Sequence, residues 1–279
     1  MASGLAWAAL AAAVFLWSNP FVGYADITYR MIAESIDGGS GFRVWEVPEF
    51  SDWIGNYMTP AGYLSLHHTI GRSLLALPAY ALFRLALSAG GALGLPAPAF
   101  GPGTPLYRAA FNLPGLLAAL LALAVLFRTA RRLAGALPAL AGTALAVASS
   151  YFFLLLVVHH SWADGPLMLA LALLVREAAA VDRGGSRGAG VWFALGLFSG
   201  LAAFFRLQAI VSLGIPAASW IILALREKGR GAPFRLLMVI AGFALGVAPA
   251  ILYEHYYVGA WNLTYTFGST GQSWGEILQ

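Results

Sequence analysis

Long stretches without a charged residue recur along this chain, and they constrain its fold more than any other feature. No Asp, Glu, Lys or Arg occurs between Leu133 and Ala163, and similar stretches cover 3–23, 188–205 and 207–225. A helix needs about 20 consecutive apolar residues to cross the hydrocarbon core of a bilayer. With 60% hydrophobic and only 10% charged residues, the chain is predicted to be an all-α polytopic membrane protein.

Stretches with few or no charges predict about seven transmembrane helices. In chain order they are 3–23, 109–127, 134–157, 165–181, 188–205, 207–225 and 236–253, and the fourth carries Arg176 and Glu177 toward its end. The first outer loop, 24–106, is predicted to hold two interfacial helices, at 26–37 and 69–88. The second of these is predicted not to cross, because only 11 uncharged residues separate Arg72 from Arg84. We expect residues 1–279 to form a single transmembrane domain, in which Gly196, Gly200 and Gly214 allow close helix packing.

The distribution of charge predicts the orientation. Ten of the sixteen basic residues lie in the clusters 128–132, 176–187 and 226–235, which the positive-inside rule assigns to the cytoplasm. The loop 24–68 carries six carboxylates and two arginines and is assigned to the outside. Because the basic residues fill short loops between spans, the net charge of +4 does not indicate a nucleic-acid partner. A composition rich in Ala, Leu, Gly and Arg with a single lysine suggests a bacterial inner membrane, with the outer face in the periplasm.

The same topology gathers polar side chains at the outer face. They are Asp26 after the first span, His159, His160 and Asp164 between the third and fourth, and Arg206 with Gln208 between the fifth and sixth. A carboxylate can accept a proton from an attacking hydroxyl. An arginine can hold a phosphate through two hydrogen bonds. Together they predict transfer of a group from a membrane lipid phosphate to an acceptor.

Each of these residues also has a purely structural interpretation. Asp26 can cap the helix that follows it, and Asp164 precedes Gly165-Pro166, a common helix start. Arg206 can extend its side chain to the membrane interface. We expect no resident metal, since the chain has no cysteine and adjacent histidines point apart on a helix. A divalent cation held by one histidine and Asp164 is the less favoured alternative.

Several short motifs resemble the GT-C glycosyltransferase superfamily, in particular bacterial relatives of protein O-mannosyltransferases and lipid A aminoarabinose transferases. The motifs are ADITYRMIA at 25–33, LSLHHTIG at 64–71 with LPAY at 77–80, DGPL at 164–167, FRLQA at 205–209 and YTFGS at 265–269. The resemblance implies a polyprenyl-phosphate sugar donor, inversion at the sugar carbon, and a lipid, glycan or protein acceptor on the outer face.

The resemblance also implies roles for single residues. Asp26 would be the catalytic base and Asp164 the second acidic residue of the catalytic pocket, while Arg206 would hold the lipid phosphate. Substrate-binding positions would include Tyr29, Arg30, His68, His159, His160 and Gln208. Members of the superfamily usually have many more spans. The chain is therefore expected to be a fragment, a minimal version that needs a partner subunit, or an inactive relative.

Two other classes of function are kept open. A lipid or sugar transporter would need charged or broken helices at mid-membrane and repeat symmetry, which the sequence does not display. A non-catalytic membrane partner subunit would suit the short chain but would not need Asp26, Asp164 and Arg206 together.

Overall fold

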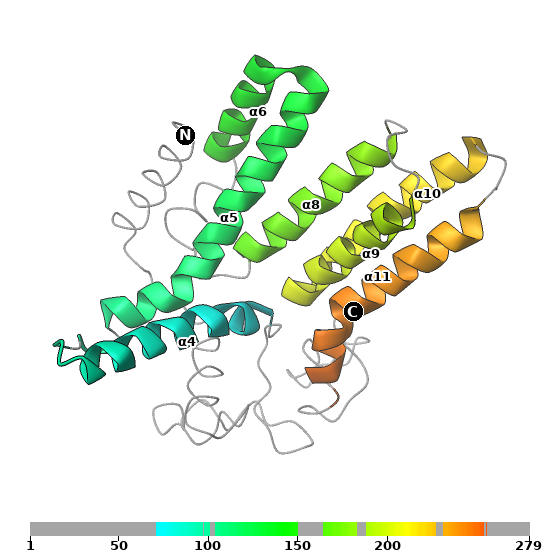
Figure 1. Ribbon diagram of the computed structural model, residues 1–279. Helices are drawn as coiled ribbons and strands as arrows, with labels where there is room; N and C mark the ends of the chain where they lie inside the picture. The colour runs from blue at the N-terminus through cyan, green and yellow to red at the C-terminus, as the bar shows by residue number, and fades with distance from the viewer. Residues whose placement is uncertain are drawn as a thin grey trace, which may run out of the picture.

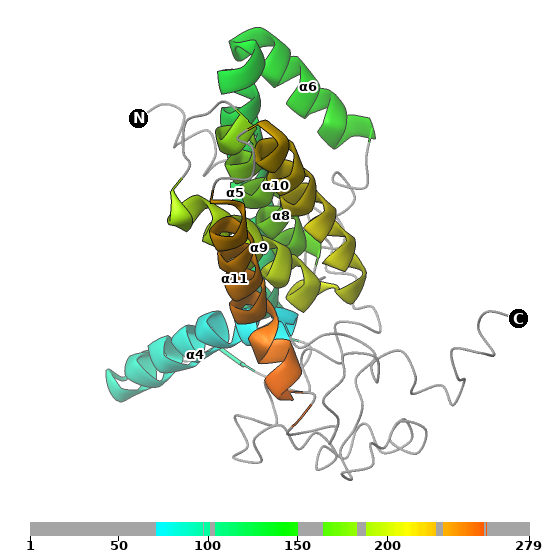
Figure 2. The same cartoon turned by 90° about the vertical axis from the view of Figure 1, so that its right-hand side faces the viewer.

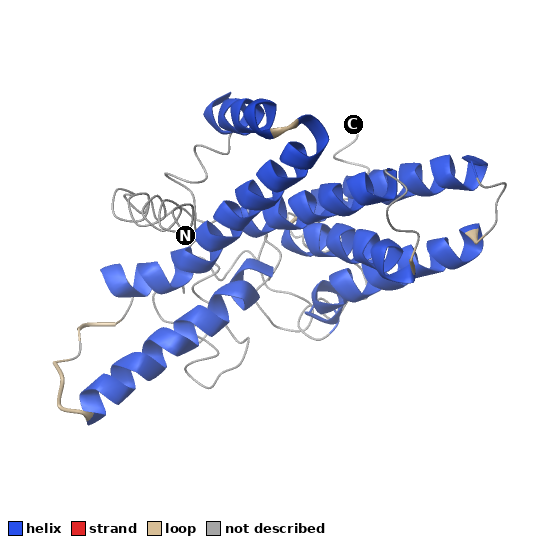
Figure 3. Ribbon diagram, turned by 45° about the horizontal axis from the view of Figure 1, so that its top comes forward, coloured by secondary structure: helices blue, strands red, loops and turns tan. Residues whose placement is uncertain are grey.

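A computed structural model of the protein describes residues 71–96, 98–100, 104–149, 164–182, 188–226, 231–253 and 255. Every regular element in these ranges is helical, as the sequence predicts (Figure 1, Figure 3). The elements are α4 (Gly71–Ala92), α5 (Pro105–Ala134), α6 (Ala136–Ser149), α8 (Asp164–Asp182), α9 (Ala189–Phe205), the 3-10 helix η3 (Leu207–Leu213), α10 (Gly214–Arg226) and α11 (Ala232–Tyr253). The predicted helices at 3–23 and 26–37 lie outside the described residues.

Four of the described segments are long and apolar enough to cross a membrane. They are Leu74–Ala92, Ala110–Ala134, Leu207–Leu225 and Ala232–Tyr253, and Ala136–Val147 and Ala189–Phe205 are shorter apolar helices. The predicted spans 165–181, 188–205 and 236–253 coincide closely with α8, α9 and α11, and 207–225 covers η3 and α10. The all-α membrane class is supported, whereas a total of seven spans stays a prediction.

Helices α8 to α11 form a bundle in which successive helices alternate in direction (Figure 1). The contact between α9 and α11, which run the same way, is very close. A methyl group added to Gly196 or Gly200 of α9 would collide with the backbone of Val239 or Phe243 of α11. Glycines let two membrane helices approach until their backbones touch. The predicted packing role of Gly196 and Gly200 is therefore confirmed.

The same prediction is wrong for Gly214. No atom lies within 4 Å of the position that a methyl group on Gly214 would take. This residue begins α10, directly after the 3-10 turn that carries the chain from α9 into α10. Its place is therefore at a junction between helical segments and not in a helix-to-helix contact.

Helix α5 is longer than the predicted span 109–127 at both ends. Thr104 caps its start, where its hydroxyl accepts a hydrogen bond from the Tyr107 N–H at 3.4 Å, and Pro105 follows in the first turn. At the other end the helix continues through Arg131 and Arg132 and stops at Gly135, whose φ of 90° few other residues adopt. Charge marks the edge of an apolar span, but it does not end a helix.

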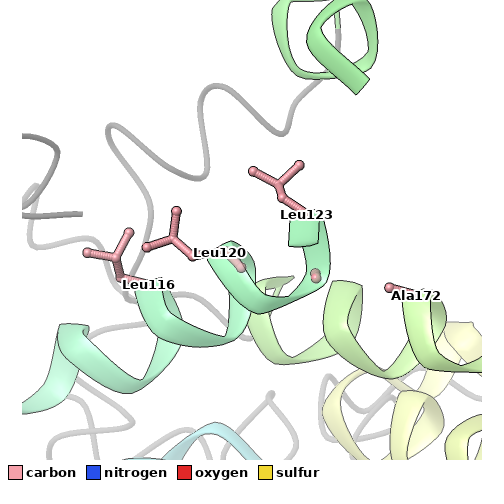
Figure 4. Close-up of a cluster of buried hydrophobic side chains, with 6 residues drawn as sticks. Leu116, Leu120, Leu123 and Ala172 are labelled. Carbon is pink, nitrogen blue, oxygen red and sulfur yellow. The ribbon is translucent and has the colours of Figure 1, made fainter. Parts of the chain in front are cut away.

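Helices α5 and α8 run in the same direction and enclose a small apolar core. Gly115 of α5 meets Gly165 at the start of α8, and Ala172 lies in one buried cluster with α5 side chains further along. Leu116, Leu120 and Leu123 of this cluster lie on one side of α5, as Figure 4 shows. The contact fixes the register between the two helices, so that Gly115 and the first turn of α8 lie at the same level.

Helix α4 begins at the lower end of the bundle and extends outward from it at a steep angle to α9–α11 (Figure 2). Its Tyr80 packs against Tyr107 and Phe111 of α5, with ring centroids 5.7 and 5.3 Å apart. Its length and composition alone would allow it to span a membrane, since its apolar part extends to Ala92 and not only to Phe83. The interfacial position predicted for 69–88 therefore stays a prediction.

Candidate functional site

The candidate site lies where α8 begins and α9 ends. Asp164 is the first residue of α8, and it stands at the positive end of the helix dipole, which favours a carboxylate. Arg206 directly follows α9 and has an extended backbone, with φ of −147° and ψ of 118°, before η3 starts at Leu207. Because α8 and α9 run in opposite directions, the two residues meet although they are 42 positions apart.

Asp164 and Arg206 form an ion pair through two atom pairs. Arg206 Nε lies 3.1 Å from Asp164 Oδ1, and Arg206 Nη2 lies 3.5 Å from Oδ2. Both contacts use the same edge of the guanidinium, so the Nη1 group and the second N–H of Nη2 are directed elsewhere. A planar guanidinium held on one edge by a carboxylate has a fixed orientation.

The two partners differ in their exposure. The Asp164 side chain is 6% exposed, whereas that of Arg206 is 49% exposed. A buried carboxylate needs a partner more than a half-exposed guanidinium does, because water can solvate only the latter. The arrangement therefore presents a positive group at the surface of the bundle, and the negative group that orients it stays inside.

The structure thus brings together two of the predicted site residues. A third, Gln208, is exposed in η3, two positions beyond Arg206. The other six predicted positions lie outside the described residues, so their placement stays a prediction: Asp26, Tyr29, Arg30, His68, His159 and His160.

A further polar residue near this end of the bundle was missed by the sequence analysis. Asn112 of α5 is only 7% exposed, in a helix whose buried residues are otherwise mostly apolar. The sequence signal for Asn112 is a single amide inside a predicted span, because a polar group is costly to place in an apolar interior.

Within the described ranges, no three His, Asp or Glu side chains gather as a metal site. The histidines considered as metal ligands, His159 and His160, are not among these residues. The less favoured alternative of a divalent cation beside Asp164 therefore stays a prediction.

Basic residues occupy the opposite end of the helices. Arg128, Arg131 and Arg132 lie in the last turns of α5, which point away from Asp164 (Figure 1). Arg176, near the end of α8, donates from Nε to Glu177 Oε1 at 2.9 Å, and Arg235 lies in the first turn of α11. The ion pair and the basic clusters thus lie at opposite ends of the bundle, as the charges of the predicted loops indicate.

No family model, curated protein or solved structure matches this chain. The resemblance to the GT-C superfamily therefore depends on the short sequence motifs alone.

Proposed function

We propose that this protein transfers a sugar from a polyprenyl-phosphate donor to an acceptor at the outer face of a bacterial inner membrane. The observation that carries the proposal is the half-exposed Arg206, held by the buried Asp164 at the end of an apolar helix bundle. In this proposal the lipid phosphate meets Arg206 at the end of the bundle, and its chain lies along the apolar helices.

Arg206 is the proposed phosphate ligand. The edge of its guanidinium that does not contact Asp164 can donate two hydrogen bonds to phosphate oxygens, a pairing stronger than that between neutral groups. Asp164 then acts as a positioning residue, because it orients Arg206 and is itself too buried to reach a large substrate directly. This role replaces the direct catalytic role that the sequence resemblance implies for Asp164.

The chemical step balances with Asp26 as the base. The acceptor hydroxyl oxygen forms a bond to the anomeric carbon of the sugar while the bond from that carbon to the phosphate oxygen breaks. The hydroxyl proton passes to the Asp26 carboxylate. The phosphate leaves with the electron pair of the broken bond, and Arg206 stabilises the charge that develops on it.

Transfer is tested with the purified protein in liposomes that contain radiolabelled mannosyl or aminoarabinosyl polyprenyl phosphate and envelope extract as the acceptor source. We expect labelled product with the native chain and at least a hundredfold less with Asp26→Asn, in line with the usual contribution of a general base. Equal product from both proteins would remove Asp26 as the base. If no product forms while labelled donor crosses the bilayer, the transporter class is favoured instead.

Phosphate recognition is tested separately from transfer. In nanodiscs, the native chain is expected to bind polyprenyl phosphate more tightly than the uncharged polyprenol. Replacing Arg206 with Gln should weaken binding of the phosphate about tenfold or more and leave polyprenol unaffected. A native chain that binds neither lipid would instead favour a non-catalytic partner subunit.

A further inference from the structure

The chain between Arg206 and α10 is a 3-10 helix that is long for this conformation. The helix η3 has seven residues, whereas runs of more than three or four are uncommon because their hydrogen-bond geometry is poorer than in an α-helix. Its first hydrogen bond joins the Ala209 N–H to the Arg206 carbonyl at 2.9 Å, and at its end the Gly214 N–H donates to the Val211 carbonyl. Arg206 is therefore tied directly to one end of η3.

Pro216 explains why the α-helical hydrogen bonds of α10 begin where they do. It is the third residue of α10, and its side chain is fully buried. In an α-helix that continued toward Arg206, the N–H of residue 216 would donate to the Ser212 carbonyl. Proline has no N–H, and its ring would collide with that carbonyl. The α-helix therefore cannot continue unbroken toward Arg206, and the residues before α10 adopt the 3-10 form.

The two helical forms differ in length, and the difference decides where Arg206 lies. A 3-10 helix rises about 2.0 Å per residue and an α-helix about 1.5 Å, so the segment would be about 3.5 Å shorter in the α form. Its α10 end is held, because Ile215 and Trp220 pack on the buried cluster shared with α8, α9 and α11, and Trp220 Nε1–H donates to the Ala232 carbonyl at 2.8 Å. An α-helix over the same residues would therefore not reach from α10 to Arg206 at its place beside Asp164.

We propose that Pro216 is a positioning residue for Arg206. By keeping η3 in its longer form, it lets Arg206 Nε lie 3.1 Å from Asp164 Oδ1. A displacement of about 3.5 Å would carry these two atoms beyond hydrogen-bond distance. The ion pair thus depends on the extended backbone of Arg206 and also on a proline ten residues further along the chain. Only the effect of Pro216 on lipid binding rests on the proposed function, whereas its effect on the backbone does not.

The distance between two spin labels measures the length of the segment. The chain has no cysteine, so labels can be attached at Gln208→Cys in η3 and Leu225→Cys in α10, both exposed positions. Pro216→Ala supplies the missing N–H. Pulsed electron paramagnetic resonance of the purified protein should show the labels about 3 Å closer if the whole segment becomes α-helical, and more than about 1 Å closer if half of it does. A smaller change overturns the inference, because the 3-10 form would then persist without the proline.

Binding of polyprenyl phosphate in nanodiscs tests the consequence for Arg206. Pro216→Ala should weaken this binding about tenfold and leave the uncharged polyprenol unaffected. Asp164→Asn should lower the phosphate affinity of the native chain but not that of the Pro216→Ala chain, in which the ion pair is already broken. Additive effects of the two substitutions would overturn the positioning role. A native chain that binds no polyprenyl phosphate refutes the proposed function, while the spin-label distance still tests the inference.

Two further variants separate the missing N–H from the space that the proline ring fills. Pro216→Val restores the N–H and also fills the buried space, so it should shorten the label distance as Pro216→Ala does. A native distance in Pro216→Val would show that only the filled volume matters and would overturn the inference. Pro138→Ala is the matched control, because Pro138 is likewise the third residue of its helix, α6, but follows Gly135 at the end of α5 and no 3-10 segment. It should change neither the distance nor the affinities, and unfolding temperatures confirm that each variant is folded.

Discussion

At the scale of single residues, the ion pair of Asp164 and Arg206 predicts an asymmetry between two substitutions. Asp164→Asn leaves a half-exposed guanidinium that water can solvate, whereas Arg206→Gln leaves a buried carboxylate without its guanidinium. The first should cost less than about 1 kcal/mol of stability, the range of an exposed pair. The second should cost about 1–3 kcal/mol, because a buried carboxylate then loses its ion pair with the guanidinium.

Thermal unfolding of the two variants in one detergent measures this difference. A double variant shows whether the two losses are independent, since residues in contact do not act additively. The asymmetry is refuted if Asp164→Asn proves the more destabilising change. Equal losses would indicate that Asp164 and Arg206 are both solvated in the folded protein.

The sequence alone was sufficient to choose Asp164 and Arg206, because a charge between two apolar stretches is rare and has few structural explanations. It did not predict that they contact each other, since that depends on the antiparallel arrangement of α8 and α9 and on the extended backbone at Arg206. Asn112 is visible in the sequence as a single amide inside a predicted span, but its place near the start of α8 depends on the register of α5 against α8, which the meeting of Gly115 and Gly165 sets.

At the scale of elements, the contact between α9 and α11 predicts which glycines tolerate a methyl group. Gly200→Ala would press its methyl group into the Phe243 carbonyl, so one helix must move, at a cost of about 1–3 kcal/mol or more. Gly214→Ala has open space and an ordinary helical φ of −57°, so it should be neutral or slightly stabilising. Unfolding temperatures in detergent compare the pair.

Equal tolerance of both substitutions would show that α9 and α11 do not touch through their backbones. The spacing of Gly196 and Gly200 predicted a shared helix face correctly, but it could not identify the partner. The partner helix, α11, follows η3 and α10 in the chain. Its glycines Gly242 and Gly246 take part in the contact because α9 and α11 run in parallel. Gly214 shows the limit of the same reasoning, since a glycine before a new helical segment resembles a packing glycine in the sequence.

At the scale of the whole molecule, the two questions are which end of the bundle faces outward and whether α4 crosses the membrane. Gly71 lies beside the last residues of α9, and the chain returns from the far end of α4 to Thr104 at the start of α5. The start of α5 and the end of α9 both belong to the end of the bundle that holds Asp164 (Figure 1). That α4 lies at the interface therefore stays a prediction, because its length and composition would also allow it to cross. The loop charges led to the same expectation through the positive-inside rule.

Labelling with a membrane-impermeant maleimide tests this arrangement, because the chain has no cysteine of its own. Suitable positions are exposed: Gln208 beside Arg206, Gly190 at the start of α9, and Gly91 near the far end of α4, the two glycines having no atom within 4 Å of an added methyl group. In intact spheroplasts we expect Gln208→Cys and Gly91→Cys to react and Gly190→Cys to react only after permeabilisation. Reaction of Gly91→Cys together with Gly190→Cys would mean that α4 crosses the bilayer. The charge-based assignment of every later loop would then be reversed relative to residues 1–70, and Asp26 could no longer act on a substrate held by Arg206.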